Sequence, residues 1–122
     1  MGREHRYIDV WNYDFETDIL FFRDKTQKYY SSIDMGDLIL DLGVDGSPIG
    51  VELLNASQNF SVSKIILSGI TGFKSLVTIS KTDIEVTITV FVKIRNTKVE
   101  KVSISHGIND LNLQAGQTAM AC

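Results

Sequence analysis

The segment from residue 37 to residue 57 limits the fold of this chain more than any other. Two short runs of alternating apolar residues flank Asp45-Gly46. Asp-Gly suits a two-residue type I′ turn, because both positions tolerate a positive φ. A one-residue slip would set Glu52 against Leu40 on the apolar face, so turn and pattern agree on one hairpin register. The predicted apolar pairs are Leu42 with Ile49, Leu40 with Val51, and Leu38 with Leu53.

Strand alternation recurs along most of the chain, whereas helical periodicity is almost absent. We therefore predict an α+β fold that is mostly β, with antiparallel strands, hairpins and one short helix, in a single domain over residues 1–122. Ser61 can cap that helix and Gly69 can end it, with Val62, Ile65 and Ile66 on its buried stripe. Besides the hairpin, strands are expected at 7–13, 19–22, 29–33, 73–80, 84–95 and 99–105, with a last one within 111–121.

Aromatic residues concentrate at the start of the chain, where eight of the eleven lie within the first 30 positions. Tyr7, Trp11 and Tyr13 share one side of the first expected strand. We therefore expect that side to be buried and the aromatic part of the core to lie there.

Strand 84–95 alternates strictly, with branched apolar residues on one side and Thr87, Thr89, Phe91 and Lys93 on the other. One face is expected to be buried and one wet. A two-residue turn at Asn96-Thr97 would oppose Val92 to Lys101. A three-residue loop through Lys98 opposes Val92 to Val102 and Val90 to Ile104, and we prefer that loop.

Composition is that of a globular protein, with 43% hydrophobic and 22% charged residues, so no metal or disulfide is needed for folding. Cys122 is the single cysteine, which fits a reducing compartment. Neither a signal peptide nor an apolar span of about 20 residues is present. We expect a cytoplasmic protein that does not enter membranes.

Charge is distributed unevenly within the net value of −3. Eleven acids and five bases give −6 over residues 1–60, and four acids and seven bases give +3 over residues 61–122. This asymmetry could guide self-association, although an evenly wetted surface is the simpler interpretation. With no basic cluster, a nucleic acid is not expected as partner.

Asp14, Glu16 and Asp18 alternate in one acidic turn, and three oxygen donors at this spacing could hold Ca²⁺ or Mg²⁺. The EF-hand pattern fails, because Ile19 stands where glycine is required and Lys25 where the bidentate glutamate belongs. We favour a structural interpretation, in which the carboxylates accept hydrogen bonds from turn amides.

Asp41 and Glu52 form a second carboxylate pair, on the side of the hairpin opposite its leucines. Paired carboxylates can serve acid–base chemistry, but a half-exposed sheet face also needs polar residues. If Glu52 is instead buried against Arg23 or Lys28, it would form a structural ion pair.

Other sequence features offer no catalytic constellation. His5 and His106 lack metal-ligand spacing, and Cys122 has no activating neighbour. No nucleophile elbow, phosphate loop or dinucleotide glycine pattern is present. We expect no cofactor, no catalytic residue and no metal site beyond the acidic candidates named above.

The first half of the chain resembles a family of small prokaryotic proteins catalogued only as a domain of unknown function. The resemblance covers about residues 7–60 and implies a small β-rich, cytoplasmic domain without assigning an activity or a site residue. Residues 61–122 then form a C-terminal extension with the short helix and antiparallel strands. The matching residues are Tyr13-Asp14-x-Glu16-x-Asp18-x-Leu20, Ile39-x-Asp41 and Gly50-x-Glu52-x-Leu54-x-Ala56-Ser57.

These observations favour a non-enzymatic module that associates with itself, as a homodimer, or with another protein. The threonine-rich side of strand 84–95, with Phe91 in it, suits sheet contact or edge pairing. The alternative is a small-ligand- or divalent-metal-binding protein, including an enzyme, that uses the acidic residues.

Overall fold

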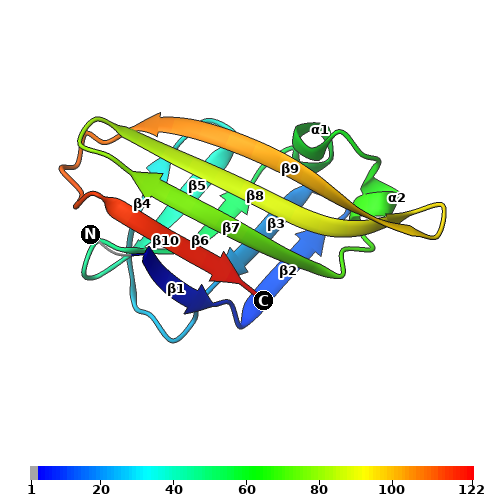
Figure 1. Cartoon of the computed structure of the whole chain (residues 1–122), viewed down its shortest axis with the longest axis horizontal. Coiled ribbons are helices and arrows are strands. Elements are labelled where there is room, and N and C mark those ends of the chain that lie inside the picture. The colour runs from blue at the N-terminus through cyan, green and yellow to red at the C-terminus, as the bar shows by residue number, and fades with distance from the viewer. Residues whose placement is uncertain (1–2) are drawn as a thin grey trace.

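Ten strands form two five-stranded sheets in the computed structural model, which describes residues 3–122 (Figure 1). Sheet A has the strand order β1-β10-β7-β8-β9, and sheet B has the order β2-β3-β6-β5-β4. All pairings are antiparallel except that of β1 with β10. The prediction of a mostly-β α+β fold is confirmed. The strands are β1 Arg3–Tyr7, β2 Val10–Asp14, β3 Ile19–Arg23, β4 Tyr29–Asp34, β5 Leu38–Gly43, β6 Pro48–Leu53, β7 Gly72–Ile79, β8 Asp83–Ile94, β9 Thr97–Ile108 and β10 Gly116–Ala121.

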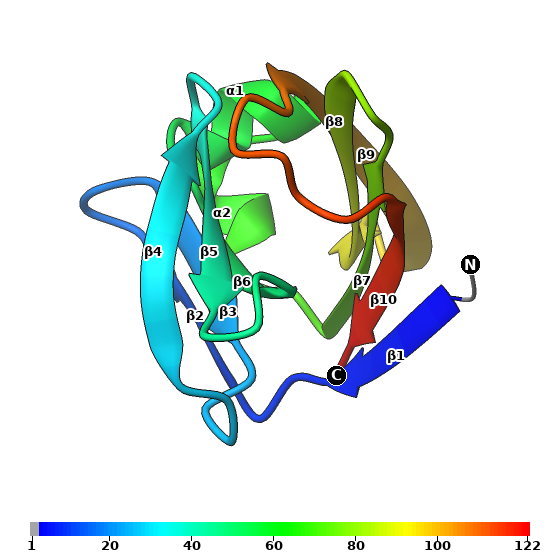
Figure 2. The ribbon, with the colours of Figure 1, turned by 90° about the vertical axis from the view of Figure 1, so that its left-hand side faces the viewer.

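The core lies between the two sheets, which face each other in Figure 2. Sheet B comprises only residues 10–53, whereas residues 72–121 supply four of the five strands of sheet A. One face of each sheet is apolar, so each half of the chain removes the apolar face of the other from water. Within residues 3–122, no helix is long and apolar enough to cross a membrane.

The central hairpin β5–β6 has the predicted partners away from its turn. Leu38 opposes Leu53 and Leu40 opposes Val51, and all four side chains are fully buried. Near the turn, a bulge sets Leu42 against Pro48 instead of Ile49. The hairpin register is therefore confirmed except for its last pair.

The predicted type I′ turn at Asp45-Gly46 is wrong. Gly46 has φ = 82°, but Asp45 is not in the left-handed region. The Gly46 N–H donates to the Gly43 carbonyl, and the Gly43 N–H donates to the Ser47 carbonyl. This is the three-residue loop with one left-handed glycine, and it leaves Val44 exposed at the tip.

The predicted strand 7–13 is two strands in different sheets, with the chain crossing between them at Ile8 and Asp9. The buried residue here is Ile8, whereas Tyr7 is 74% and Trp11 is 38% exposed. The expectation of a buried aromatic face was therefore wrong. Trp11 meets Phe73 edge-on with 5.9 Å between ring centroids, at the margin of the core.

Two short helices, α1 Ala56–Phe60 and α2 Lys64–Leu67, replace the one predicted helix. Ser61 ends α1 in the left-handed conformation, and Ser63 caps α2 by accepting the Ile66 N–H. Leu67 is buried, whereas Ile65, expected on the buried stripe, is 74% exposed. Helix α1 contacts β9 and α2 contacts β8, and both lie between the two sheets (Figure 2).

The β8–β9 hairpin corrects the predicted three-residue loop. Arg95 and Asn96 both have positive φ and form a two-residue turn, so Val92 opposes Val99 and Val90 opposes Lys101. The preferred pairing with Val102 and Ile104 maximised apolar contact along β9. The actual register instead turns three of the four apolar residues of β9, namely Val102, Ile104 and Ile108, to the outside.

Candidate functional site

The acidic turn between β2 and β3 is organised around Asp18. Its φ of 58° and a hydrogen bond from its N–H to the Asp14 carbonyl close the turn. The side chain is buried, with 8% of the residue exposed. The turn therefore directs this carboxylate into the protein and away from solvent.

Three donors satisfy the Asp18 carboxylate. The Tyr13 hydroxyl donates to Oδ1 at 2.6 Å, the Ser57 N–H to Oδ1 at 3.0 Å and the Ser57 hydroxyl to Oδ2 at 2.7 Å. Burial raises the pKa of Asp18, but the hydrogen bonds from Tyr13 and Ser57 outweigh it and the net pKa is lowered. Burial and the bond to Asp18 raise the pKa of Tyr13. Asp18 thus fastens α1 to the β2–β3 turn.

Asp14 and Glu16 do not join Asp18 around a common centre. Asp14 accepts the backbone N–H groups of Glu16 and Thr17, and hydrogen bonding from Thr17 and Glu16 lowers its pKa. Glu16 is exposed. Within residues 3–122, no three His, Cys, Asp or Glu side chains are grouped to hold a metal ion. Metal binding by this turn remains a hypothesis.

Asp41 lies on the outer face of sheet B and is nevertheless 98% buried, since only 2% of it is exposed. Arg23 donates to Oδ2 at 2.7 Å and the Ser32 hydroxyl donates to Oδ1 at 2.8 Å. The Arg23 guanidinium also lies over the rings of Phe21 and Tyr29, at 5.3 and 5.1 Å from their centroids. These aromatic rings and the arginine shield the carboxylate from water.

Glu52 is half-buried on the same face, opposite Ile39 and diagonal to Asp41. The two carboxylates therefore lie on the side of the hairpin opposite its leucines, as predicted. However, the arginine considered as a partner for Glu52 pairs with Asp41. The structure therefore shows Asp41 in an ion pair with Arg23.

Gly50 makes this arrangement possible by lying between Arg23 and Asp41 in adjacent strands. A Cβ at this position would come within 2.5 Å of the Phe22 carbonyl oxygen and 2.9 Å of the Arg23 Cα. The sequence marked Gly50 and Asp41 as parts of one pattern, but it contained no signal that Arg23 and Ser32 complete the cluster.

Arg6 forms a second link that the sequence reasoning missed. It extends from β1 in sheet A, donates to the Ser47 hydroxyl at 2.6 Å and lies 3.6 Å from the Asp24 carboxylate. Both charged side chains are 8% exposed. Because Ser47 and Asp24 belong to loops of sheet B, Arg6 joins the two sheets at one edge.

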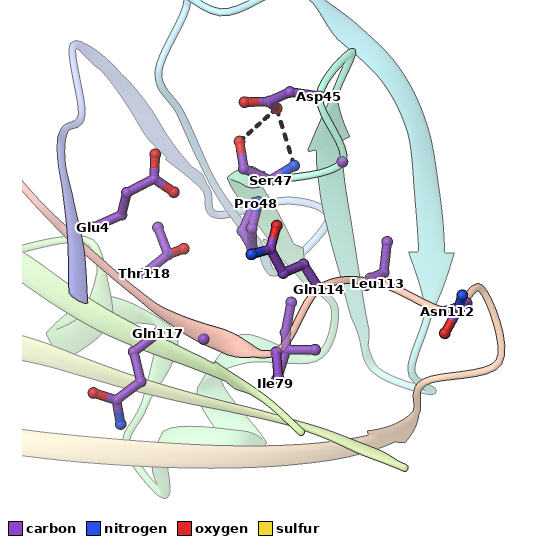
Figure 3. A pocket seen from close by; sticks show the side chains of 13 residues that line it. Glu4, Asp45, Ser47, Pro48, Ile79, Asn112, Leu113, Gln114, Gln117 and Thr118 are labelled. Atoms are coloured by element: carbon purple, nitrogen blue, oxygen red, sulfur yellow. Dashed lines mark hydrogen bonds between the residues drawn. The ribbon is translucent and has the colours of Figure 1, made fainter. Parts of the chain in front are cut away.

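A cavity of about 380 Å³ lies beside Ser47, and Figure 3 shows the side chains that line it. Glu4, the Asp45–Pro48 turn and the segment 112–118 line it. Asp45 is held by the Ser47 hydroxyl and N–H, and these hydrogen bonds lower its pKa. None of the five predicted acidic candidates lines this cavity.

The outer side of sheet A exposes several apolar side chains to solvent. Val102, Ile104 and Ile108 of β9 are 50%, 56% and 71% exposed, whereas Ser103 is buried. A hollow of about 620 Å³ lies nearby on the same sheet, with Tyr7, Leu76 and Thr89 among its walls. Strand β9 is also the end strand of sheet A, so this apolar surface borders an open sheet edge.

Comparison with known proteins gives two archaeal relatives. A Methanosarcina mazei protein named "Putative hypoxanthine phosphoribosyltransferase" is 36% identical over 111 residues, covering 91% of this chain and 90% of that protein. An uncharacterized protein from Methanocaldococcus jannaschii is 29% identical over 110 residues, covering 89% of this chain and 95% of that protein. No solved structure matches the chain.

The family described as "Protein of unknown function (DUF2283)" matches residues 11–57. This stretch spans the five strands of sheet B and the beginning of α1, and it contains the Tyr13–Asp18–Ser57 and Arg23–Asp41 contacts. The predicted family resemblance is therefore confirmed, and the chain belongs to this uncharacterised family, DUF2283.

Proposed function

We propose that this chain is a non-enzymatic module that associates with a second copy of itself through β9 and the adjoining outer side of sheet A. The residue pattern of β9 supports the proposal, because polar side chains face the core and most apolar side chains face solvent. Val102, Ile104 and Ile108 face solvent, while Lys101, Ser103 and Ser105 oppose the buried residues of β8. Exposed apolar side chains along an open strand edge are a site for pairing with another chain.

The charges on the β8–β9 hairpin favour a second copy as the partner. Lys93, Arg95 and Lys98 lie at its turn, whereas Asp83 and Glu85 lie at its other end. A two-fold axis that reverses the strand direction brings the basic end of one copy beside the acidic end of the other. Self-association would therefore bring apolar surface against apolar surface and basic residues beside acidic ones.

The molar mass in solution tests this proposal. We expect a dimer for the native chain and a monomer for Ile104→Lys, measured by light scattering after size-exclusion chromatography. Ile65→Lys is the matched control, because Ile65 is equally apolar and 74% exposed but lies on α2. Melting curves check that both variants fold.

Two results would overturn the proposal. One is a native chain that stays monomeric up to about 1 mM, well above the dissociation constant of a weak specific complex. The other is a mass that grows without limit, which would indicate head-to-tail contact between the faces of sheets A and B.

The alternative is a small-ligand- or divalent-metal-binding protein, including an enzyme. The name of the M. mazei relative makes hypoxanthine phosphoribosyl transfer the specific enzyme activity to consider under this alternative. Against this alternative, the oxygens of Asp18 and Asp41 already accept hydrogen bonds within the protein. Turnover of hypoxanthine with a phosphoribosyl donor would replace our proposal.

We further propose a single domain in the cytoplasm with no nucleic acid partner. The single core shared by both sheets supports the proposal of one domain. The single cysteine and the net charge of −3 support the others.

A further inference from the structure

The open edge of β9 presents a defined set of backbone groups. Antiparallel partners alternate between pairs that exchange hydrogen bonds and pairs that do not. Ile94 and Thr97 flank a two-residue turn and so form a hydrogen-bonded pair. By alternation, the N–H and C=O groups of the even-numbered residues from Lys98 to Ile108 point away from β8. Within residues 3–122, no strand pairs with this edge, which is the upper margin of sheet A in Figure 1, although helix α1 contacts β9.

We propose that two copies pair β9 with β9 in antiparallel fashion about a two-fold axis at Ser103. This inference rests on the proposed self-association and adds the edge and the register. Val102 of one copy then lies opposite Ile104 of the second, and sheet A continues without a break through both molecules. The remaining even-numbered pairs are Glu100 with His106 and Lys98 with Ile108.

The side chains of β9 distinguish this register from its neighbours. A slip of one residue would place outward-facing side chains against inward-facing ones. A two-residue shift in one direction sets Lys98 against His106 and Glu100 against Ile104. The opposite shift sets Val102 against His106. Those two shifts also pair Val102 or Ile104 with its own counterpart. Pairing about Ser103 alone places both Val102 and Ile104 against apolar residues and a carboxylate against an imidazole.

The same two-fold places Lys101 of one copy directly opposite Ser105 of the other. Such a non-hydrogen-bonded pair has its Cα atoms about 4.5 Å apart, within the range that a disulfide spans. Lys101 and its own counterpart are four positions out of register, about 13 Å apart. Cysteines at 101 and 105 therefore report the register while leaving Val102, Ile104, Glu100 and His106 unchanged.

The experiment uses full-length Lys101→Cys and Ser105→Cys chains, each carrying Cys122→Ser and a tag of different size. Mild oxidation of the mixture is expected to give a cross-linked hetero-dimer on a non-reducing gel, and neither variant alone should cross-link. Adding Ile104→Lys to both chains should abolish the product. Should either cysteine variant fail to melt cooperatively, Glu100→Cys with His106→Cys gives a second reporter pair, about 5.5 Å apart.

The outcomes separate this inference from the proposed function. A native dimer whose mixed cysteine variants do not cross-link would overturn the register and leave self-association intact. Cross-linking of either variant with itself would also overturn the register. A monomeric native chain would overturn both.

Discussion

The Ser57 hydroxyl donates a 2.7 Å hydrogen bond to Oδ2 of Asp18, which ties the beginning of α1 to the β2–β3 turn. The Ala56 N–H donates to the Asp18 carbonyl oxygen at 3.0 Å, so the backbone of the same residue also holds the helix. With five residues, α1 is too short to persist without tertiary support. The acidic turn therefore positions a helix that packs against β9.

Replacing this carboxylate should weaken the whole domain. We expect Asp18→Ala to lower the free energy of unfolding by about 2–3 kcal/mol, because buried donors of Tyr13 and Ser57 lose their acceptor. Urea denaturation measures the change. Glu16→Ala, at an exposed position of the same turn, should stay within about 0.5 kcal/mol of the native chain. The Asp18→Ala and Ser57→Ala effects should be less than additive, and full additivity would contradict the contact.

The same contact predicts a dependence of stability on acid pH. The folded-state pKa of Asp18 lies below its ordinary value of 3.8, so its stabilisation is complete above that value and is lost as the pH falls through the folded-state pKa. Asp18→Asn should therefore flatten the acid side of a stability curve measured between about pH 2 and pH 7. The remaining slope should come from Asp14 and Asp45, whose pKa values are also lowered. An unchanged slope would contradict the assignment.

The raised pKa of Tyr13 predicts a loss of stability on the alkaline side of the stability curve. Its folded-state pKa is raised above the ordinary value of 10.0, so its stabilisation is present below that value and is lost as the pH rises further. Tyr13→Phe should be less stable than the native chain near neutral pH and should lose less stability above about pH 10. Absorbance titration of the tyrosines would show a late-ionising group in the native chain that is missing from the variant.

The buried ion pair on sheet B should be costly to break. We expect Asp41→Ala to lower the free energy of unfolding by about 2 kcal/mol, a value reduced because the Arg23 side chain is 26% exposed. Glu52→Ala is the comparison, since it removes a half-buried carboxylate from the same face without touching Arg23. Equal losses for the two variants in urea denaturation would argue against a special role for Asp41.

Gly50 should be intolerant of any side chain. We expect Gly50→Ala to cost about 1–3 kcal/mol, because the added carbon meets the backbone of β3, which cannot move aside like a flexible side chain. Gly72→Ala is the matched control in a strand, since its Cβ would meet only the Phe91 ring at an ordinary 3.7 Å. Melting temperatures of the two variants would show the difference, and equal shifts would refute it.

Divalent metals should leave the melting temperature unchanged. The oxygens of Asp18 already accept three hydrogen bonds, and the Asp14 carboxylate accepts two turn N–H groups. A thermal screen with Ca²⁺ and Mg²⁺ measures this, since a ligand specific for the folded state raises its stability. A shift that disappears in Asp14→Asn with Asp18→Asn would revive the metal hypothesis.

Local chemistry was sufficient to predict several elements. The alternation in 84–94 and the leucines of 38–42 place apolar side chains on one side of a strand at a period of two, whatever lies beyond. The core of the central hairpin, the long strand β8 and the mostly-β fold could therefore be predicted. The polar segment 14–18 was also recognisable as a turn.

Other elements depended on contacts between distant residues. Nothing near Tyr7 or Trp11 indicates that the chain leaves one sheet for the other at Ile8, so a buried side was predicted where the structure exposes both rings. Phe22, in the same aromatic stretch, is fully buried. The turn after β8 was misjudged because apolar pairing was assumed to decide the register. The left-handed conformations of Arg95 and Asn96 decided it instead.

The sequence alone determined that most of the chain forms strands and which face of the central hairpin is apolar, since both follow from side-chain alternation over a few positions. Only the tertiary structure decided that Asp14, Asp18 and Asp41 serve as hydrogen-bond acceptors and that β9 turns Val102, Ile104 and Ile108 outward. The physical reason is that burial and partnership depend on neighbours far apart in the chain: Ser57 for Asp18, Arg23 for Asp41 and β8 for β9.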